Sequence, residues 1–168
     1  MAGFESAPRR SGGWATLRED VHVHVGAPDV RAHLADPTGY HRWLPPAVRD
    51  VRADSEGASF VLGLPGRQED VSLRRTPSDD AREVVYRMDD GGVVDTLRWG
   101  LYPEGPRECH VTVELVYRPP RGFLGGAMET LLHRGQRTQF LRDFLWNLKR
   151  DIERSAGRLG GSAEVAGG

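Results

Sequence analysis

The segment that decides the fold is Leu124–Arg154, LGGAMETLLHRGQRTQFLRDFLWNLKRDIER, which contains no proline. Its second half places apolar residues at helical spacing, at Leu141, Phe144, Leu145, Leu148 and Ile152. This pattern predicts a helix with one apolar stripe, and we expect Met128, Leu131 and Leu132 to extend the stripe towards the helix start. At ~1.5 Å per residue, about 30 residues make a helix about 45 Å long, so it needs a broad apolar surface to lie on.

The chain before this helix has the pattern of short strands separated by turns. In residues 20–25, DVHVHV, valines alternate with His22 and His24, so one face of the strand is apolar. Six further strands are predicted at 47–53, 59–64, 68–75, 82–88, 93–102 and 108–118. Their short connections favour antiparallel hairpins over crossovers. Two short helical pieces are expected between the first two strands, one broken at Asp36-Pro37 and one over residues 40–44.

This order of elements predicts an α+β fold in which a curved seven-stranded antiparallel sheet packs against the long C-terminal helix. Such a sheet twists and curls, and one helix about 10 Å wide does not fill its concave side. We therefore expect the remaining space to hold large side chains, the short helices or a ligand. The single domain is predicted at 14–155, with flexible tails at 1–13 and 156–168 that have little apolar surface to bury.

Composition excludes several classes of protein. Lys and Arg number 23 and Asp and Glu 24, giving a net charge of −1, which argues against a nucleic-acid binder. The sequence lacks the run of about 18–20 apolar residues that a membrane-spanning helix needs, and its N-terminus lacks a signal-peptide pattern. The single cysteine, Cys109, cannot form an intrachain disulfide and is expected to be a small buried residue. We expect a cytoplasmic protein.

Four segments carry a family resemblance. Residues 21–30, VHVHVGAPDV, form a strand that runs into an A-P-x-x-V helix start, and residues 36–45, DPTGYHRWLP, begin with Asp-Pro and end with W-x-P. Residues 117–125, YRPPRGFLG, have the pattern of a strand-to-helix junction, and residues 145–149 read LWNLK. In this order, over about residues 16–155, they resemble the START-like or SRPBCC superfamily with its helix-grip fold, in particular the polyketide cyclase/dehydrase and lipid transport branch.

The resemblance implies a hydrophobic small molecule, such as a lipid, a quinone or a polyketide-like compound, bound between the sheet and the long helix without a cofactor. Because one fold serves many functions, two alternatives stay open. One is a cyclase or aromatase that uses the same cavity, with acid–base groups drawn from His41, Tyr86, Asp95 and Arg98. The other is a protein-interaction module without a ligand.

Strand alternation and the aromatic residues of the short helices indicate which side chains line the cavity. Trp43, Tyr86 and Trp99 are the leading candidates because an aromatic ring with a polar tip suits an apolar wall beside a hydrogen-bonding group. The full predicted set is Tyr40, Trp43, Phe60, Leu62, Tyr86, Met88, Leu97, Trp99, Val113, Met128 and Leu132. The same pattern also fits an ordinary hydrophobic core.

Two polar side chains are candidate anchors for a ligand. Asp95 has the strand parity of Val93, Leu97 and Trp99, and a carboxylate on an apolar face needs a partner; the alternative is a position at the wet rim of the sheet. His41 stands beside aromatic residues, where it would lie at a pocket mouth or on the surface.

No metal site is predicted. His22 and His24 share a strand face, but no cysteine or acidic residue accompanies them at ligand spacing, so surface histidines are expected. The long helix has an excess of arginine, which suits either a solvated face or peripheral contact with an anionic membrane. We expect a monomer or a homodimer.

Overall fold

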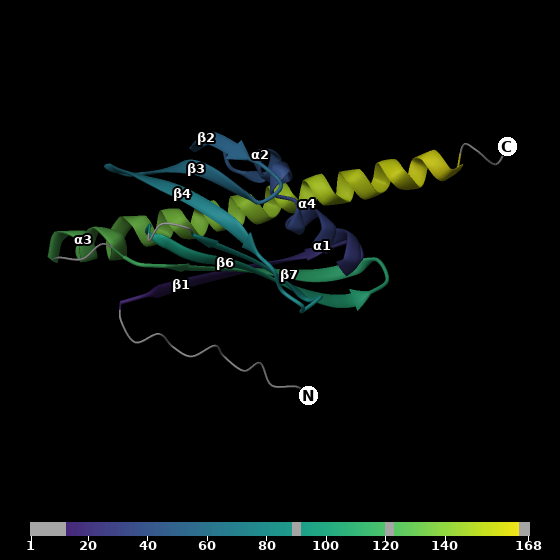
Figure 1. The fold of residues 1–168 in the computed structure, drawn as a ribbon, viewed down its shortest axis with the longest axis horizontal. Helices are drawn as coiled ribbons and strands as arrows, with labels where there is room; N and C mark the ends of the chain where they lie inside the picture. Colours follow the sequence, from purple (N-terminus) through teal and green to yellow (C-terminus); the bar gives the residue numbers. More distant parts are fainter. Residues whose placement is uncertain (1–12, 89–91, 120–122, 165–168) are drawn as a thin grey trace, which may run out of the picture.

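The computed structural model describes residues 13–88, 92–119 and 123–164, and in these residues one antiparallel sheet of seven strands curls around one long helix (Figure 1). The strands are β1 (Ala15–Val23), β2 (Val48–Ala53), β3 (Gly57–Leu64), β4 (Arg67–Thr76), β5 (Glu83–Met88), β6 (Val94–Gly105) and β7 (Glu108–Tyr117). Their order across the sheet is β1-β7-β6-β5-β4-β3-β2, so consecutive strands pair as hairpins except at β1. The predicted helix-grip fold is confirmed.

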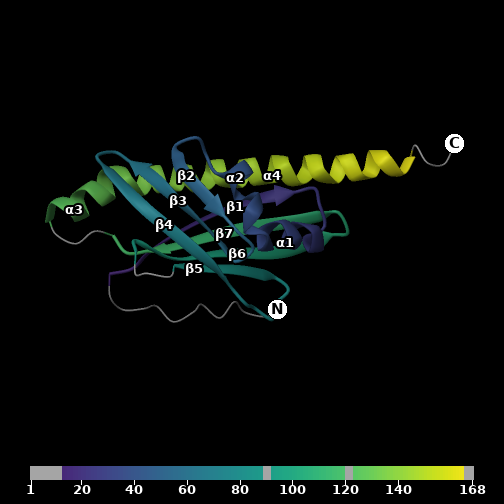
Figure 2. The ribbon, with the colours of Figure 1, turned by 45° about the horizontal axis from the view of Figure 1, so that its top comes forward.

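Short helices separate β1 from β2, and a helical segment ends the chain. The first group is α1 (Ala27–Ala35), the single 3-10 turn η1 (Pro37–Gly39) and α2 (Tyr40–Trp43). The second is α3 (Phe123–Met128), the π-helical turn η2 (Glu129–His133) and α4 (Arg134–Glu164). Figure 2 shows α4 lying along the sheet, with its last turns projecting beyond it.

The expected tails are described only in part. Residues 1–12 and 165–168 lie outside the described residues, and residues 156–164 belong to α4. The helix therefore extends past Arg154, where the apolar stripe predicts its end, as far as Glu164.

The apolar stripe of α4 packs onto the concave face of the sheet. Leu141, Leu148 and Ile152 are fully buried, and Phe144 and Leu145 are 1% and 2% exposed. The stripe is confirmed, and its burial supplies the main attraction between helix and sheet, at about 25 cal/mol per Å² of apolar surface removed from water.

The expected extension of this stripe to the helix start is wrong. Met128, Leu131 and Leu132 are 40%, 77% and 45% exposed, whereas Glu129 and His133 lie buried in their place. The π-helical turn η2 aligns these two polar residues with the buried stripe, where ion pairs and hydrogen bonds compensate for their lost hydration.

Aromatic side chains fill the centre of the grip, which is the space between the concave face of the sheet and α4. The ring of Tyr40 lies 5.2 Å from Trp43, 5.3 Å from Tyr86 and 5.5 Å from Phe144, and Trp99 lies 5.3 Å from Phe144. Phe144 is 1% exposed, and the other four residues have no exposed surface: Tyr40, Trp43, Tyr86 and Trp99. A void that could hold water beside a ring would leave accessible surface on it. The centre of the space expected between sheet and helix is therefore occupied by side chains.

The short helix α2 is fastened to α4 by polar contacts. Trp43 donates from Nε1 to Asp151 over 2.9 Å, Arg42 donates from Nε to the same oxygen over 3.0 Å, and Asn147 donates to the Trp43 carbonyl over 3.0 Å. Burial disfavours ionisation of Asp151, but the bonds from Trp43 and Arg42 hold its pKa below the usual value. These contacts hold Tyr40 and Trp43 in the core.

A bulge in β6 changes the side-chain alternation around Asp95. The register with β7 shifts between Val94 and Thr96, and both of these residues are buried, as is Leu97. Asp95 is only half-buried and accepts a hydrogen bond from Thr96 Oγ1 over 2.8 Å. The alternation that groups Asp95 with Val93 and Leu97 is therefore interrupted at Asp95 itself, because one extra residue lies in β6 there, and ligand contact by Asp95 stays a prediction.

Candidate functional site

A buried polar cluster lies where η2 and the start of α4 meet the sheet. We call it the Arg137 cluster; it comprises Glu69 of β4, Tyr117 of β7, Glu129 and His133 of η2, and Arg137 of α4. Arg137 is fully buried and donates to both carboxylate oxygens of Glu69 over 2.7 and 2.6 Å. It also donates from Nε to Glu129 over 3.0 Å. Such paired, charge-assisted bonds fix the guanidinium plane.

The charges of the Arg137 cluster balance. Arg67 adds a second guanidinium 3.1 Å from Glu69, so two arginines face two carboxylates. Burial works against ionisation of Glu129, but hydrogen bonds from Arg137 hold the pKa of Glu129 below its usual value. Burial likewise works against a charged Arg137, yet its bonds to Glu69 raise its pKa. Glu129 and Arg137 are therefore charged at neutral pH.

Two buried polar atoms of the Arg137 cluster lack a hydrogen-bond partner. The hydroxyl of Tyr117 has none, and the Arg137 guanidinium carbon lies 4.5 Å from its ring centre. Burial, then the charge of Glu129 and a side-chain contact with its carboxylate, raise the pKa of Tyr117 to about 12, so the hydroxyl keeps its proton. Glu129 therefore lies near the Tyr117 hydroxyl, although outside hydrogen-bonding geometry. His133 Nδ1 lies 3.5 Å from Glu129 but outside hydrogen-bonding geometry.

The hydrogen bond at Nε2 of His133 determines which hydrogen-bonding role is left to its Nδ1 atom. His133 Nε2 lies 3.0 Å from the Pro65 carbonyl, which can only accept a hydrogen bond. Nε2 must therefore carry a proton, and in the tautomer that carries only this proton Nδ1 is an acceptor. Tyr117 thus provides a donor and His133 an acceptor, and an unpaired buried polar group costs about 1–3 kcal/mol.

An apolar surface adjoins the Arg137 cluster. Helical spacing places Met128, Leu132 and Phe140 on one flank of η2 and α4. The Phe140 ring lies 6.2 Å from Phe60 of β3, and His133 of η2 lies 3.0 Å from the Pro65 carbonyl directly after β3, so this side of the helix runs along β3, where Leu64 is also buried. Met128 and Leu132 remain nearly half exposed. The η2 end of the grip therefore combines apolar side chains that are partly uncovered with unpaired polar atoms.

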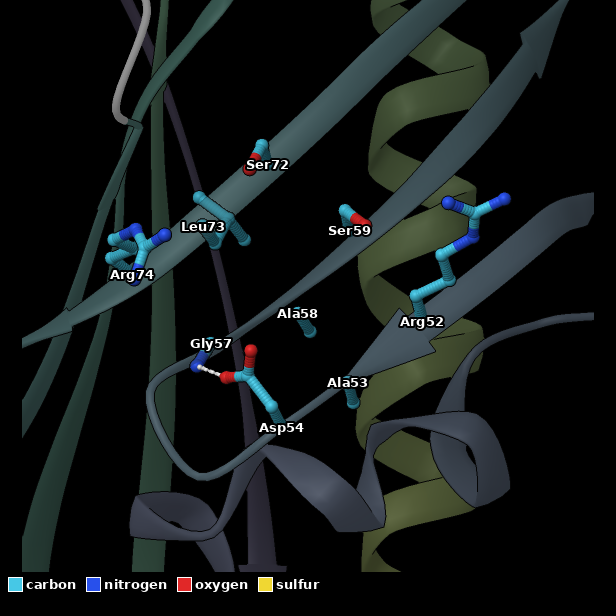
Figure 3. A pocket seen from close by; sticks show the side chains of 9 residues that line it. All are labelled: Arg52, Ala53, Asp54, Gly57, Ala58, Ser59, Ser72, Leu73 and Arg74. Atoms are coloured by element: carbon cyan, nitrogen blue, oxygen red, sulfur yellow. Dashed lines mark hydrogen bonds between the residues drawn. The ribbon is translucent and has the colours of Figure 1, made fainter.

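A shallow pocket of about 220 Å³ lies elsewhere, over β2, β3 and β4 (Figure 3). Arg52, Ser59, Ser72 and Arg74 contribute side chains to it, and Asp54 accepts a hydrogen bond from the Gly57 amide over 2.9 Å. Ser59 and Ser72 alternate with the buried Ala58 and Leu73, so this pocket opens on the convex face of the sheet, away from α4. It is distinct from the expected cavity.

Residues 15–153 match the family model described as polyketide cyclase / dehydrase and lipid transport. The chain belongs to this family. The match confirms the resemblance drawn from the sequence. No curated protein sequence matches the chain significantly. None of the helices in the described residues has an apolar stretch long enough to cross a bilayer.

Solved structures share the fold at low sequence identity. The protein TTHA0849 from Thermus thermophilus has a TM-score of 0.69 and 16% identity, covering 84% of this chain and 99% of its own. The Zhui aromatase/cyclase from a Streptomyces species has a TM-score of 0.61 and 17% identity, covering 85% and 96%. A START superfamily protein from Mycobacterium smegmatis has a TM-score of 0.53 and 14% identity, covering 86% and 98%.

The predicted lining residues of this polyketide cyclase/dehydrase family member fall into two groups. Phe60 and Leu62 are buried on β3, and Met88, Met128 and Leu132 are partly exposed. The second group is buried in the core, with at most 3% of each residue exposed: Tyr40, Trp43, Tyr86, Leu97, Trp99 and Val113. The polar tips in that second group are already used, since Tyr86 donates to the Leu34 carbonyl over 2.6 Å and Trp99 lies within 3.3 Å of the Tyr40 hydroxyl. Ligand contact by any of them stays a prediction.

The expected polar groups do not gather at one place. His41 is exposed and its Nδ1 lies 2.6 Å from the Thr38 carbonyl. Arg98 lies 4.0 and 3.9 Å from Glu83 and Glu114, on the strand face opposite Trp99, whereas Tyr86 points into the core. Cys109 is fully buried, as expected.

The sequence analysis missed the Arg137 cluster, although a signal was present. Glu129, His133 and Arg137 stand four residues apart on the line that leads into Leu141, which is the buried stripe itself. Glu69 has the inward parity of Val71 and Leu73 on its strand. Charged residues at core positions on two facing elements predict a buried ion pair.

The Arg137 cluster predicts acid sensitivity. Because the pKa of Glu129 is lower in the folded protein, its stabilising contribution is present above the unfolded value of about 4.3 and is lost as the pH falls through the folded value. We expect the free energy of unfolding, measured by urea titration at pH 7, 5, 4 and 3, to fall below about pH 4.5. Glu129→Gln should be less stable at pH 7 and show a shallower fall, and a slope equal to that of the wild type would contradict this role.

Proposed function

We propose that the protein binds a neutral, mainly apolar small molecule that carries oxygen groups, such as a lipid, a quinone or a polyketide-like compound, between the sheet and the long helix at its η2 end. The observation that carries the proposal is the pairing of two unsatisfied buried polar atoms, Tyr117 Oη and His133 Nδ1, with the partly uncovered apolar flank of Met128 and Leu132. The centre of the grip offers no comparable feature, because its aromatic side chains are packed against each other.

The charge balance of the Arg137 cluster favours a neutral ligand. Glu69 and Glu129 already neutralise Arg137 and Arg67. An anionic group brought beside Tyr117 would find both arginines already paired with carboxylates, and desolvating the anion would add a further cost. A carbonyl oxygen would instead accept from the Tyr117 hydroxyl, and a ligand hydroxyl would donate to His133 Nδ1.

The apolar flank would supply most of the affinity. Covering Met128 and Leu132 together with the ligand's own surface removes apolar area from water, worth about 25 cal/mol per Å² before ordering costs. The family description includes lipid transport, which agrees with a ligand of this kind.

Adjacent leucines offer a matched test of the proposed site. Leu132 is 45% exposed on the flank towards β3, whereas Leu131 is 77% exposed. Nile red, a neutral dye with a carbonyl oxygen, should bind the wild type with blue-shifted, saturable fluorescence. Leu132→Asp should weaken its affinity at least about tenfold because it places a charge in the apolar wall, and Leu131→Asp should leave the affinity within about twofold.

A second variant tests the polar atoms. Tyr117→Phe should weaken Nile red binding by about three- to tenfold, the value of one hydrogen bond, while far-ultraviolet circular dichroism stays unchanged. Absence of saturable binding to the wild type, or equal losses for Leu131→Asp and Leu132→Asp, would contradict the proposed site.

The alternative function is a cyclase or aromatase that uses the same site. The observation that favours it is the close grouping of Tyr117, Glu129 and His133, which would supply a proton donor and an acceptor to a folded polyketone. A solved structure with the same fold is an aromatase/cyclase. With a synthetic poly-β-ketone thioester, a cyclase would form cyclised product, and His133→Gln would lose turnover while retaining affinity. A carrier would bind the compound and release it unchanged.

A further inference from the structure

Two histidines and one glutamate meet on the outer side of the sheet near the β6–β7 turn. His22 of β1 pairs in register with His110 of β7, and Glu104 comes from β6, so three neighbouring strands each contribute one residue. His22 Nδ1 lies 2.7 Å from Glu104 Oε2. One ligand atom from each of the three residues lies within 4.8 Å of the others.

From this arrangement we propose that His22, Glu104 and His110 form a binding site for a divalent cation of the zinc class. Two imidazoles and one carboxylate are a ligand set that Zn²⁺ prefers, with water free to complete a tetrahedron. Mg²⁺ and Ca²⁺ prefer oxygen ligands only and would bind weakly here. The site lies on the convex face and is independent of the proposed ligand site at η2.

The geometry requires only side-chain movement. Zinc bonds of about 2.0–2.1 Å bring tetrahedral ligands to about 3.3 Å from each other, which is closer than the upper limit of 4.8 Å in the structure. The side chains of His22, Glu104 and His110 are 38%, 47% and 35% exposed, so they have room to rotate. Asp20 lies 3.2 Å from His110 Nε2, an arrangement that orients a metal-binding imidazole.

The backbone that carries these residues is closely packed. A Cβ atom at Gly26 would lie 2.6 Å from the Pro106 carbonyl oxygen, so the turn after β1 packs directly on the β6–β7 turn. A cation at this place would link β1, β6 and β7 at one end of the sheet. A second grouping, His22 with His24 and Glu108, shares His22, so the two cannot be filled with separate ions at once.

Isothermal titration of the untagged protein with ZnCl₂ tests the site. We expect one Zn²⁺ per chain, a rise in the thermal midpoint with Zn²⁺, and no rise with Mg²⁺ at the same concentration. His22→Ala, His110→Ala and Glu104→Gln should each weaken Zn²⁺ binding at least about tenfold. His41→Ala, which removes an exposed histidine on α2, should leave it unchanged.

Three results would overturn the proposal. The first is a wild type that binds Zn²⁺ no better than Mg²⁺. The second is undiminished binding in His22→Ala and His110→Ala, with folding verified by circular dichroism. The third is a greater loss in His24→Ala than in His110→Ala, which would assign the cation to the other grouping.

Discussion

Arg137→Met should destabilise the protein by about 3–5 kcal/mol, because it leaves the buried carboxylates of Glu69 and Glu129 without their main partner. Arg67 still faces Glu69, but its own side chain is 32% exposed, so it compensates for only part of the lost charge. Urea unfolding at pH 7, with the midpoint and slope both recorded, measures the loss.

Two further variants separate a buried ion pair from ordinary packing. Arg142→Met removes an arginine that is 57% exposed and pairs with Glu19 over 3.1 Å, so it should cost about 0–1 kcal/mol. Adding Glu69→Gln and Glu129→Gln to Arg137→Met should recover part of the lost stability, because the unpaired buried charges disappear. Equal losses for Arg137→Met and Arg142→Met would contradict the described burial.

Phe144→Ala should cost about 3–5 kcal/mol through the cavity it leaves at the centre of the aromatic core. The Phe144 ring lies 5.3 Å from Trp99, 5.5 Å from Tyr40 and 5.8 Å from Phe140, and its side chain is 1% exposed. Trp43, whose ring lies 6.3 Å from Phe144, is held by a hydrogen bond to Asp151, and Trp99 is held by one to the Tyr40 hydroxyl, so these neighbours cannot easily move inward.

Trp146, two residues further along α4, is the matched control. It is 57% exposed, so Trp146→Ala should change the free energy of unfolding by no more than about 0.5 kcal/mol. Comparable losses for the two variants would mean that the centre of the grip is not packed as described.

The periodicity of apolar residues predicted most of the fold. The spacing from Leu141 to Ile152 was sufficient to predict the buried stripe, and valine alternation in residues 20–25 was sufficient to predict the face of β1. These patterns are local, and they report which side of an element meets the core. The order of strands and short helices then leaves few topologies with hairpin connections.

The departures from the sequence pattern, at the start of the long helix and around Asp95, share a physical cause. Met128, Leu131 and Leu132 continue the apolar spacing, yet Glu129 and His133 are buried instead, because Arg137 joins Glu129 to Glu69 of β4 and His133 bonds to the Pro65 carbonyl. Helical spacing alone cannot weigh a buried ion pair against an apolar contact, because the partner, Glu69, lies on another element. The sequence pattern does not reveal the β6 bulge either, because apolar and polar residues alternate regularly before and after Asp95.

The same limit applies to His22. Its acidic neighbour Glu104 comes from β6 rather than from the adjacent sequence, so a search at ligand spacing along the chain does not find it. The polar atoms of Tyr117 and His133 show a related limit, because only the folded structure shows which buried groups lack a partner.

The most direct test of the proposed ligand site is an NMR measurement of contacts between 1-naphthol, a neutral aromatic alcohol, and the methyl groups of the protein. With methyl-labelled Met, Leu and Val, the account predicts intermolecular nuclear Overhauser effects to Met128, Leu132 and Leu64. Overhauser effects confined to Val51 of β2 and Val61 of β3, with none to Met128 or Leu132, would contradict it, as would the absence of any effect at saturating 1-naphthol.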